Sequence, residues 1–138
     1  MNILFVCKWN RFRSKAAEAI FNKLNKNKQY NSKSAGLFPG VPVTEDIIKA
    51  GKRLGIKISR KQKGITHKLL MWSNIIIVID DNIPISLFKE VIENDNKKVF
   101  QWKFKDVIGR NINERERIIL KIKEKIEKFL IEKNNPNL

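Results

Sequence analysis

The sequence predicts an α/β protein in which a four-stranded parallel sheet is covered by helices on both faces. Short apolar runs suited to buried strands alternate with longer segments whose apolar residues recur at helical spacing. The strongest strand signal, residues 74–79, contains an unbroken β-branched run, which is typical of a parallel strand buried on both sides. The chain of 138 residues suits a single domain, 1–138, and its 42% hydrophobic content is enough for one core.

The first half of the chain is expected to hold two strands and two helices. Residues 2–6 are almost wholly apolar and predict a buried strand, which a helix over 14–25 follows with its alanines and aliphatic residues toward the sheet. A second strand is expected over 31–35. Thr44 caps the next helix, which Gly55 ends.

The second half continues the alternation. The expected elements are a short helix at 66–72, a strand at 74–79, a helix at 84–93, a strand at 98–102, a long helix at 113–133 and a frayed tail at 134–138. Pro84 suits a first helical turn. The long helix has its apolar stripe at Ile119, Ile122, Ile126 and Phe129, and its charged outer face is expected to be solvated.

The segment between the first strand and the first helix carries the strongest functional signal, because Cys7 and Arg13 are separated by five residues there. A loop that enters a helix N-terminus directs several backbone N–H groups toward one point, which favours anion binding. Those surroundings also favour the thiolate form of Cys7, and the Ser14 hydroxyl can donate to its sulfur. Arg13 offers a planar fork of donors for two phosphate oxygens. The pattern predicts a nucleophile inside an oxyanion cradle.

Cys7 is the only cysteine, which excludes an intrachain disulfide and a cysteine-based metal cluster. The alternative interpretation is a small buried residue at a strand end. The spacing to Arg13 and Ser14 favours catalysis. No metal or cofactor is expected, because the loop and the thiol supply the chemistry themselves.

Several motifs together resemble the low-molecular-weight protein tyrosine phosphatase family, which also includes arsenate reductases and bacterial arginine phosphatases. Residues 6–14, followed by Ala-Glu-Ala at 17–19, resemble its signature. Residues 34–36 resemble the end of its second strand, and 75–80 its third strand with a terminal aspartate. The resemblance covers essentially the whole chain and implies a flavodoxin-like three-layer sandwich.

The resemblance also implies roles for individual residues. The nucleophile would be Cys7, the phosphate-binding arginine Arg13 and the general acid Asp106. The phosphate-binding residues would be Lys8, Trp9, Asn10, Arg11, Phe12, Arg13 and Ser14. Asn10, Ser14, Ser34 and Asp80 would brace the site from behind. Two alternatives remain open: Asp80 with Asp81 as a solvated capping pair, and Asp106 as a plain surface residue.

The sequence departs from the family pattern at four positions. Phe12 stands where the family commonly has a second cysteine that can trap an oxidised nucleophile as a disulfide. Trp9 stands where glycine is frequent, and Val107 where proline often follows the general acid. Arg11 replaces a small or apolar residue; it either adds positive charge to the crevice or points outward. Phe38, in a nearby loop, either stacks on a substrate ring or anchors the loop to the core.

The net charge of +15 and the absence of carboxylates between residues 47 and 79 suggest acidic partners. Compositional bias is the favoured explanation, because no nucleic-acid motif accompanies the charge, so nucleic acid is not expected as a partner. His67, the only histidine, lies in a polar turn and is not expected to act chemically. No run reaches membrane-spanning length and the start lacks a signal-peptide pattern, so a cytoplasmic protein is expected.

The sequence therefore predicts a cysteine-dependent phosphatase for phosphotyrosine proteins or small aryl phosphates. The enzymatic alternatives are a protein arginine phosphatase and an arsenate reductase that takes electrons from an external thiol. The non-enzymatic alternative is a weakly active phosphate-binding or nucleic-acid-associated module.

Overall fold

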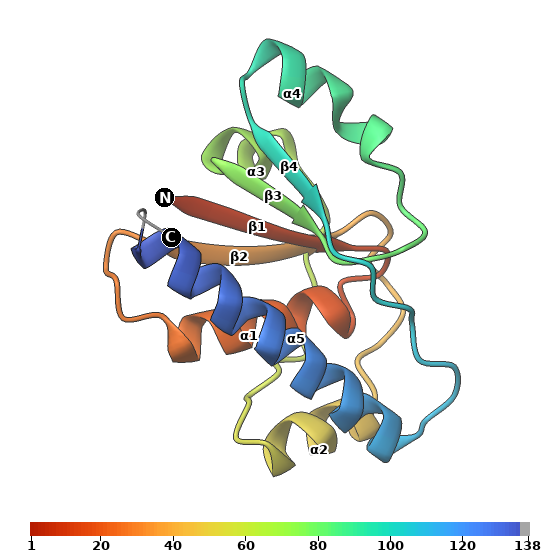
Figure 1. The fold of residues 1–138 in the computed structure, drawn as a ribbon. Helices are drawn as coiled ribbons and strands as arrows, with labels where there is room; N and C mark the ends of the chain where they lie inside the picture. The colour runs from red at the N-terminus through yellow and green to blue at the C-terminus, as the bar shows by residue number, and fades with distance from the viewer. Residues whose placement is uncertain (136–138) are drawn as a thin grey trace.

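A computed structural model describes residues 1–135 and contains a four-stranded parallel sheet with strand order β2-β1-β3-β4 (Figure 1). The strands are β1 (Asn2–Cys7), β2 (Asn31–Gly36), β3 (Ile75–Val78) and β4 (Lys98–Gln101). Ile3 lies opposite Ser32 on one side and Ile75 on the other, and every pairing is parallel. All strands therefore end at the same edge of the sheet, where Cys7 closes β1.

Helices cover both faces of the sheet, which confirms the predicted flavodoxin-like fold class. They are α1 (Arg13–Leu24), α2 (Glu45–Arg53), α3 (His67–Trp72), the 3-10 helix η1 (Ile85–Phe88), α4 (Lys89–Asn94) and α5 (Ile112–Asn134). The helices α1 and α5 lie side by side on one face with α2 beyond them, whereas α3 and α4 lie on the other (Figure 1). No helix within residues 1–135 is both long and apolar enough to cross a bilayer.

The alternation of side chains along β1 divides the core between the two faces. Ile3, Phe5 and Cys7 pack toward α1 and α5, and the residues between them pack toward α3 and α4. Four aromatic rings with centroids 5.9–6.5 Å apart fill the larger core: Phe5, Phe21, Trp102 and Phe129. This packing holds α1 and α5 against the sheet.

One element differs clearly from the sequence prediction. The helix expected at 84–93 is a 3-10 turn followed by the six-residue α4, because Pro84 is extended (ψ 138°) and only Phe88 and Val91 are buried there. The other boundaries move by about one or two residues. Asn134, expected in the tail, is the last residue of α5, and 136–138 lie outside the described residues.

Candidate active site

The Cys7 loop, residues 7–14, connects β1 to α1 and places the thiol at the N-terminus of a 12-residue helix. Cys7 is buried, and its Sγ lies 2.9 Å from Ser14 Oγ. Helix α1 begins at Arg13, one residue earlier than expected, and the Ala16 N–H donates to Phe12 O at 2.8 Å. A negative charge on the sulfur would be stabilised by the serine hydroxyl and by the positive end of the helix dipole.

Asn10 is the hub that holds the loop in shape. Its backbone is left-handed (φ 49°), a conformation that asparagine tolerates better than most residues. The buried amide donates to Ser14 Oγ at 2.8 Å and to Ser34 Oγ at 3.0 Å, and it accepts from the Lys63 N–H at 2.8 Å. Ser34 in turn donates to Glu18 at 2.8 Å. The structure thus brings together Asn10, Ser14 and Ser34, and it adds Glu18, which lies in the Ala-Glu-Ala motif but received no role from the sequence.

Gly36 allows the loop to lie directly on the end of β2. A Cβ added there would come within 2.5 Å of the Asn10 backbone nitrogen and 2.7 Å of the Trp9 carbonyl carbon. The segment after Gly36 also holds the loop, because the Leu37 and Phe38 N–H groups donate to the carbonyls of residues 7 and 8 at 3.2 and 2.8 Å. Only glycine leaves room for this contact.

Arg13 is buried and fixed from two sides. One terminal nitrogen, NH2, lies 2.9 Å from Asp80 Oδ2, and the other, NH1, donates to Phe104 O at 2.9 Å. Asp80, 1% exposed, also accepts from the Lys8 N–H at 3.2 Å and from the Asn82 N–H at 2.9 Å. Asp80 is therefore no solvated capping residue; it orients the arginine of the loop while it closes a turn after β3.

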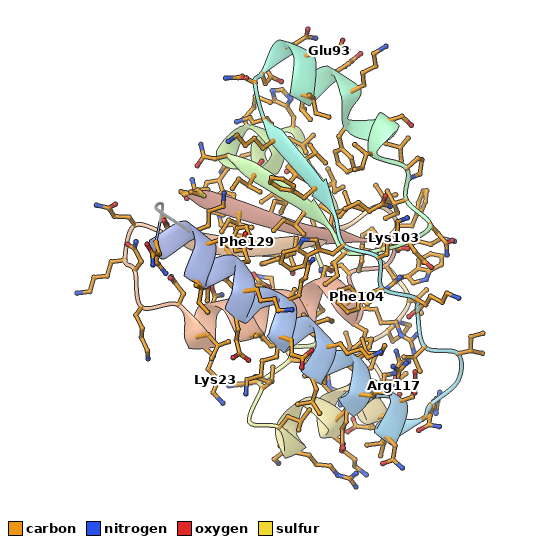
Figure 2. The ribbon with its side chains drawn as sticks, in the orientation of Figure 1. Lys23, Glu93, Lys103, Phe104, Arg117 and Phe129 are labelled. Atoms are coloured by element: carbon orange, nitrogen blue, oxygen red, sulfur yellow. The ribbon has the colours of Figure 1, made fainter. Side chains whose placement is uncertain are left out.

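Asp106 lies in the connection from β4 to α5, whose residues Lys103 and Phe104 mark its path in Figure 2. Its side chain is 35% exposed, and Oδ2 lies 3.9 Å from Arg13 NH2. Its Oδ1 accepts from the Val107 N–H at 2.9 Å. The fold thus brings a carboxylate from far along the chain to the mouth of the Cys7 loop.

The mouth of the loop is aromatic and basic. Trp9 and Phe38 have ring centroids 6.3 Å apart, and Lys8 Nζ lies 4.7 Å from the Trp9 ring. Phe38 is 60% exposed, so it does not anchor its loop to the core. The Arg11 side chain is held by the loop that follows β2, since its Nε donates to Pro42 O at 2.8 Å.

Two further charged residues are buried beside the loop. Lys15 donates to Ser59 Oγ at 3.0 Å and to Lys61 O, and burial lowers its pKa despite the opposing attraction of Glu18. Arg115 on α5 is completely buried, and the sequence reasoning gave it no role. Its spacing could have revealed this burial, because Arg115 precedes Ile118, Ile119 and Ile122 by three, four and seven residues and so lies on the apolar stripe of α5.

His67 begins α3 as an exposed residue, and Phe12 is buried beneath the loop. Phe12 can thus contribute to anion binding through its backbone rather than its ring. The side chains of the loop residues expected to bind phosphate differ in exposure. Lys8 is exposed, whereas Asn10 and Phe12 are buried.

The sequence profile described as "Low molecular weight phosphotyrosine protein phosphatase" matches residues 2–134. The chain belongs to this family. It is 34% identical over 132 residues to "Arsenate reductase 1" of Staphylococcus epidermidis, with 92% of this chain and 93% of that protein covered. The family therefore groups phosphatases with enzymes named arsenate reductases.

Solved structures share the fold at lower identity. A protein tyrosine phosphatase from Entamoeba histolytica superposes with a TM-score of 0.83 at 23% identity, covering 100% of this chain and 99% of its own. The YwlE arginine phosphatase from Geobacillus stearothermophilus gives a TM-score of 0.84 at 17% identity, covering 98% and 94%. The same fold thus occurs in proteins named for different substrates.

Proposed function

We propose that this family member is a cysteine-dependent phosphatase that hydrolyses phosphotyrosine proteins or small aryl phosphates through a cysteinyl-phosphate intermediate. The observation that carries the proposal is the convergence of three groups at one edge of the sheet. The sulfur of Cys7 lies beside a hydroxyl, the guanidinium of Arg13 is fixed by a buried carboxylate, and the carboxylate of Asp106 lies 3.9 Å from that guanidinium.

In the first step Cys7 Sγ attacks phosphorus in line. The S–P bond forms as the bond from phosphorus to the leaving oxygen breaks. The loop N–H groups and Arg13 bind the three equatorial oxygens, where charge must be stabilised in the transition state. Asp106 donates its proton to the leaving oxygen, so that no free alkoxide or phenoxide is released.

In the second step a water molecule attacks the phosphorus of the intermediate. Asp106, now ionised, takes the proton of this water, and the S–P bond breaks. The Cys7 thiolate is restored and inorganic phosphate leaves. The hydroxyl of Ser14, 2.9 Å from the sulfur, stabilises the thiolate as it departs.

The mouth of the site supports an aromatic substrate. Trp9 and Phe38 present two rings beside the loop, and an aryl group of the substrate can stack there. A cytoplasmic location belongs to the proposal, because the catalytic thiol must stay reduced. Since Phe12 replaces a possible second cysteine, oxidised Cys7 would depend on an external thiol for recovery.

Arsenate reduction is the second candidate, favoured by the name of the Staphylococcus epidermidis relative. Cys7 would displace water from arsenate to form an S–As bond. An external thiol would then attack the sulfur, so that the S–As bond breaks and arsenic leaves as arsenite with the two electrons that the thiols give up. Cys7 and the external thiol remain as a mixed disulfide, which a second external thiol reduces. With a single cysteine, this reaction depends on the added thiol.

The deciding experiment measures hydrolysis of an aryl phosphate by the wild type and by Cys7→Ser, with chelator present and no added metal. Turnover that vanishes in Cys7→Ser, while phosphate still binds, is the expected result. A wild type that binds phosphate without turning over would favour a binding module instead. Thiol-dependent arsenite release with negligible hydrolysis would favour the second candidate.

The role of Asp106 is tested with Asp106→Asn. Hydrolysis should slow by about 10²-fold, most for substrates with poor leaving groups, because these need the proton most. Asp95→Asn, an exposed carboxylate after α4, is the control and should leave the rates unchanged. Equal slowing for good and poor leaving groups would remove Asp106 from proton transfer.

A further inference from the structure

Arg115 is a buried arginine with one donor that has no hydrogen-bond partner. It lies in the first turn of α5 and is 0% exposed. Its Nε donates to Asp46 Oδ2 at 2.9 Å, and its NH2 donates to Gly109 O at 3.2 Å. Its NH1 is one of two buried side-chain polar atoms in residues 1–135 without a partner. A buried donor without a partner is costly, so its surroundings call for an explanation.

The unpartnered nitrogen faces the proposed general acid. Arg115 NH1 lies 3.9 Å from Asp106 Oδ1, and Arg13 NH2 lies 3.9 Å from Asp106 Oδ2. The carboxylate therefore lies between two buried arginines, one on each oxygen. A movement of Asp106 by about 1 Å toward Arg115 would complete a normal hydrogen bond.

The Nε side of the Arg115 guanidinium is held by Asp46, which is itself fixed by a second hydrogen bond. Asp46 also accepts a hydrogen bond from Thr44 Oγ1. Burial by itself would raise the pKa of Asp46, but the hydrogen bonds from Thr44 and Arg115 outweigh it and lower the pKa. The guanidinium also lies 4.7 Å from the centroid of the Phe12 ring, beneath the Cys7 loop. Arg115 thus connects α2, the Cys7 loop and the 106–109 segment.

We propose that Arg115 is the positioning residue that orients Asp106 for proton transfer. This inference rests on the function proposed above. When a phosphate group occupies the Cys7 loop, its oxygens compete with Asp106 for the donors of Arg13. Arg115 then remains as the charged partner of Asp106, beside the Val107 N–H. Because both groups can only donate, Oδ1 serves them as an acceptor. The proton is thereby kept on Oδ2, the oxygen that faces the loop and the leaving group.

The test compares Arg115→Met with Arg117→Met. Arg117 lies two residues further along α5, is half exposed and pairs with Glu114, so its loss controls for an arginine removed from the same helix (Figure 2). For each variant, kcat is measured with a good and with a poor leaving group on one preparation. The ratio of the two rates does not depend on how much of the preparation is folded and active.

We expect Arg115→Met to change this ratio by about 10-fold or more against the poor leaving group, and Arg117→Met to leave it unchanged. In an Asp106→Asn background, Arg115→Met should change the ratio by less than about twofold. Both substitutions remove the same function, proton transfer from Asp106 to the leaving group. Independent effects that multiply, or an unchanged ratio, would overturn the proposal. If Arg115→Met does not fold, Asp46→Asn is the second variant. It weakens the contact that holds Arg115 Nε, so it should change the ratio in the same direction.

A second measurement does not require turnover. Trypsin can cut the 103–111 connection after Lys103, Lys105 or Arg110, all exposed, and loss of the Arg115 contacts should speed cleavage there several-fold. Cleavage after Lys23 of α1 reports global unfolding. Unchanged cleavage in Arg115→Met would overturn the positioning role. Loss of wild-type turnover alone would count against the proposed function while leaving this result to stand.

Discussion

Replacing Asn10 with alanine is the most demanding test of how the Cys7 loop is held. Three hydrogen bonds depend on the Asn10 amide, to Ser14, Ser34 and Lys63. Asn10 is fully buried and left-handed. Alanine would therefore remove these three hydrogen bonds. It would also have to adopt the left-handed backbone conformation, which alanine disfavours more than asparagine does.

The expected cost follows from these contacts. A lost hydrogen bond reduces the free energy of unfolding by about 1 kcal/mol, so three account for about 3 kcal/mol. The left-handed φ of 49° adds roughly 1 kcal/mol for alanine. We expect a total loss of about 4 kcal/mol, a large share of the roughly 5–15 kcal/mol typical of a domain.

Urea unfolding of the wild type, Asn10→Ala and Asn25→Ala measures this cost. Asn25 is a matched control, because its amide also makes three hydrogen bonds, but it is only half buried and has an ordinary φ of −69°. Water can replace its bonds, so we expect a loss of about 1–2 kcal/mol there. Phosphate in large excess over its Kd should stabilise Asn25→Ala as it does the wild type, by about 2–3 kcal/mol at 100-fold excess, and Asn10→Ala much less. If Asn10→Ala loses no more free energy of unfolding than Asn25→Ala, the hydrogen bonds of Asn10 do not stabilise the loop to the expected extent.

The pH dependence of stability and the aromatic mouth give two further predictions. Because burial lowers the pKa of Lys15, the unfolded chain holds more protons than the folded one between that lowered pKa and the ordinary value of about 10.4. Across this window the stability of the wild type should rise with pH relative to Lys15→Met in urea titrations, and parallel curves would contradict the burial argument. Phe38→Ala should raise KM for aryl phosphates by roughly 3- to 10-fold and leave alkyl phosphates unaffected; an equal change for both would argue against stacking.

Much of the fold was predictable because its signals are local. Local sequence signals located the four strands and all described helices except the 84–93 segment, where the helical pattern hid a 3-10 turn followed by a short α4. The Cys7 loop was predictable for the same reason, since Cys7, Arg13 and Ser14 lie within eight residues of one another. The order of strands and helices then required a parallel sheet, because short αβ connections permit little else.

Arg115 shows where local reasoning failed. The predicted apolar stripe of α5 began at Ile119 and left Arg115 out, although the spacing places Arg115 on that stripe. Its burial is possible because Asp46 from α2 pairs with it there. The residues near Arg115 in the sequence do not indicate that Asp46 is its partner. Burial of a charge is a pairwise property, so it could not be inferred from either residue alone.

The sequence by itself determined the α/β architecture, the cysteine loop and the family, because each is written in contiguous residues with a period or a spacing. Only the tertiary structure decided the environment of those residues. It set Asp80 against Arg13, turned Arg11 away from the cradle, exposed Phe38 beside Trp9 and placed Asp106 between two arginines. These outcomes depend on where the carboxyl ends of the strands and the following loops converge in space, and that convergence exists only once the sheet has formed.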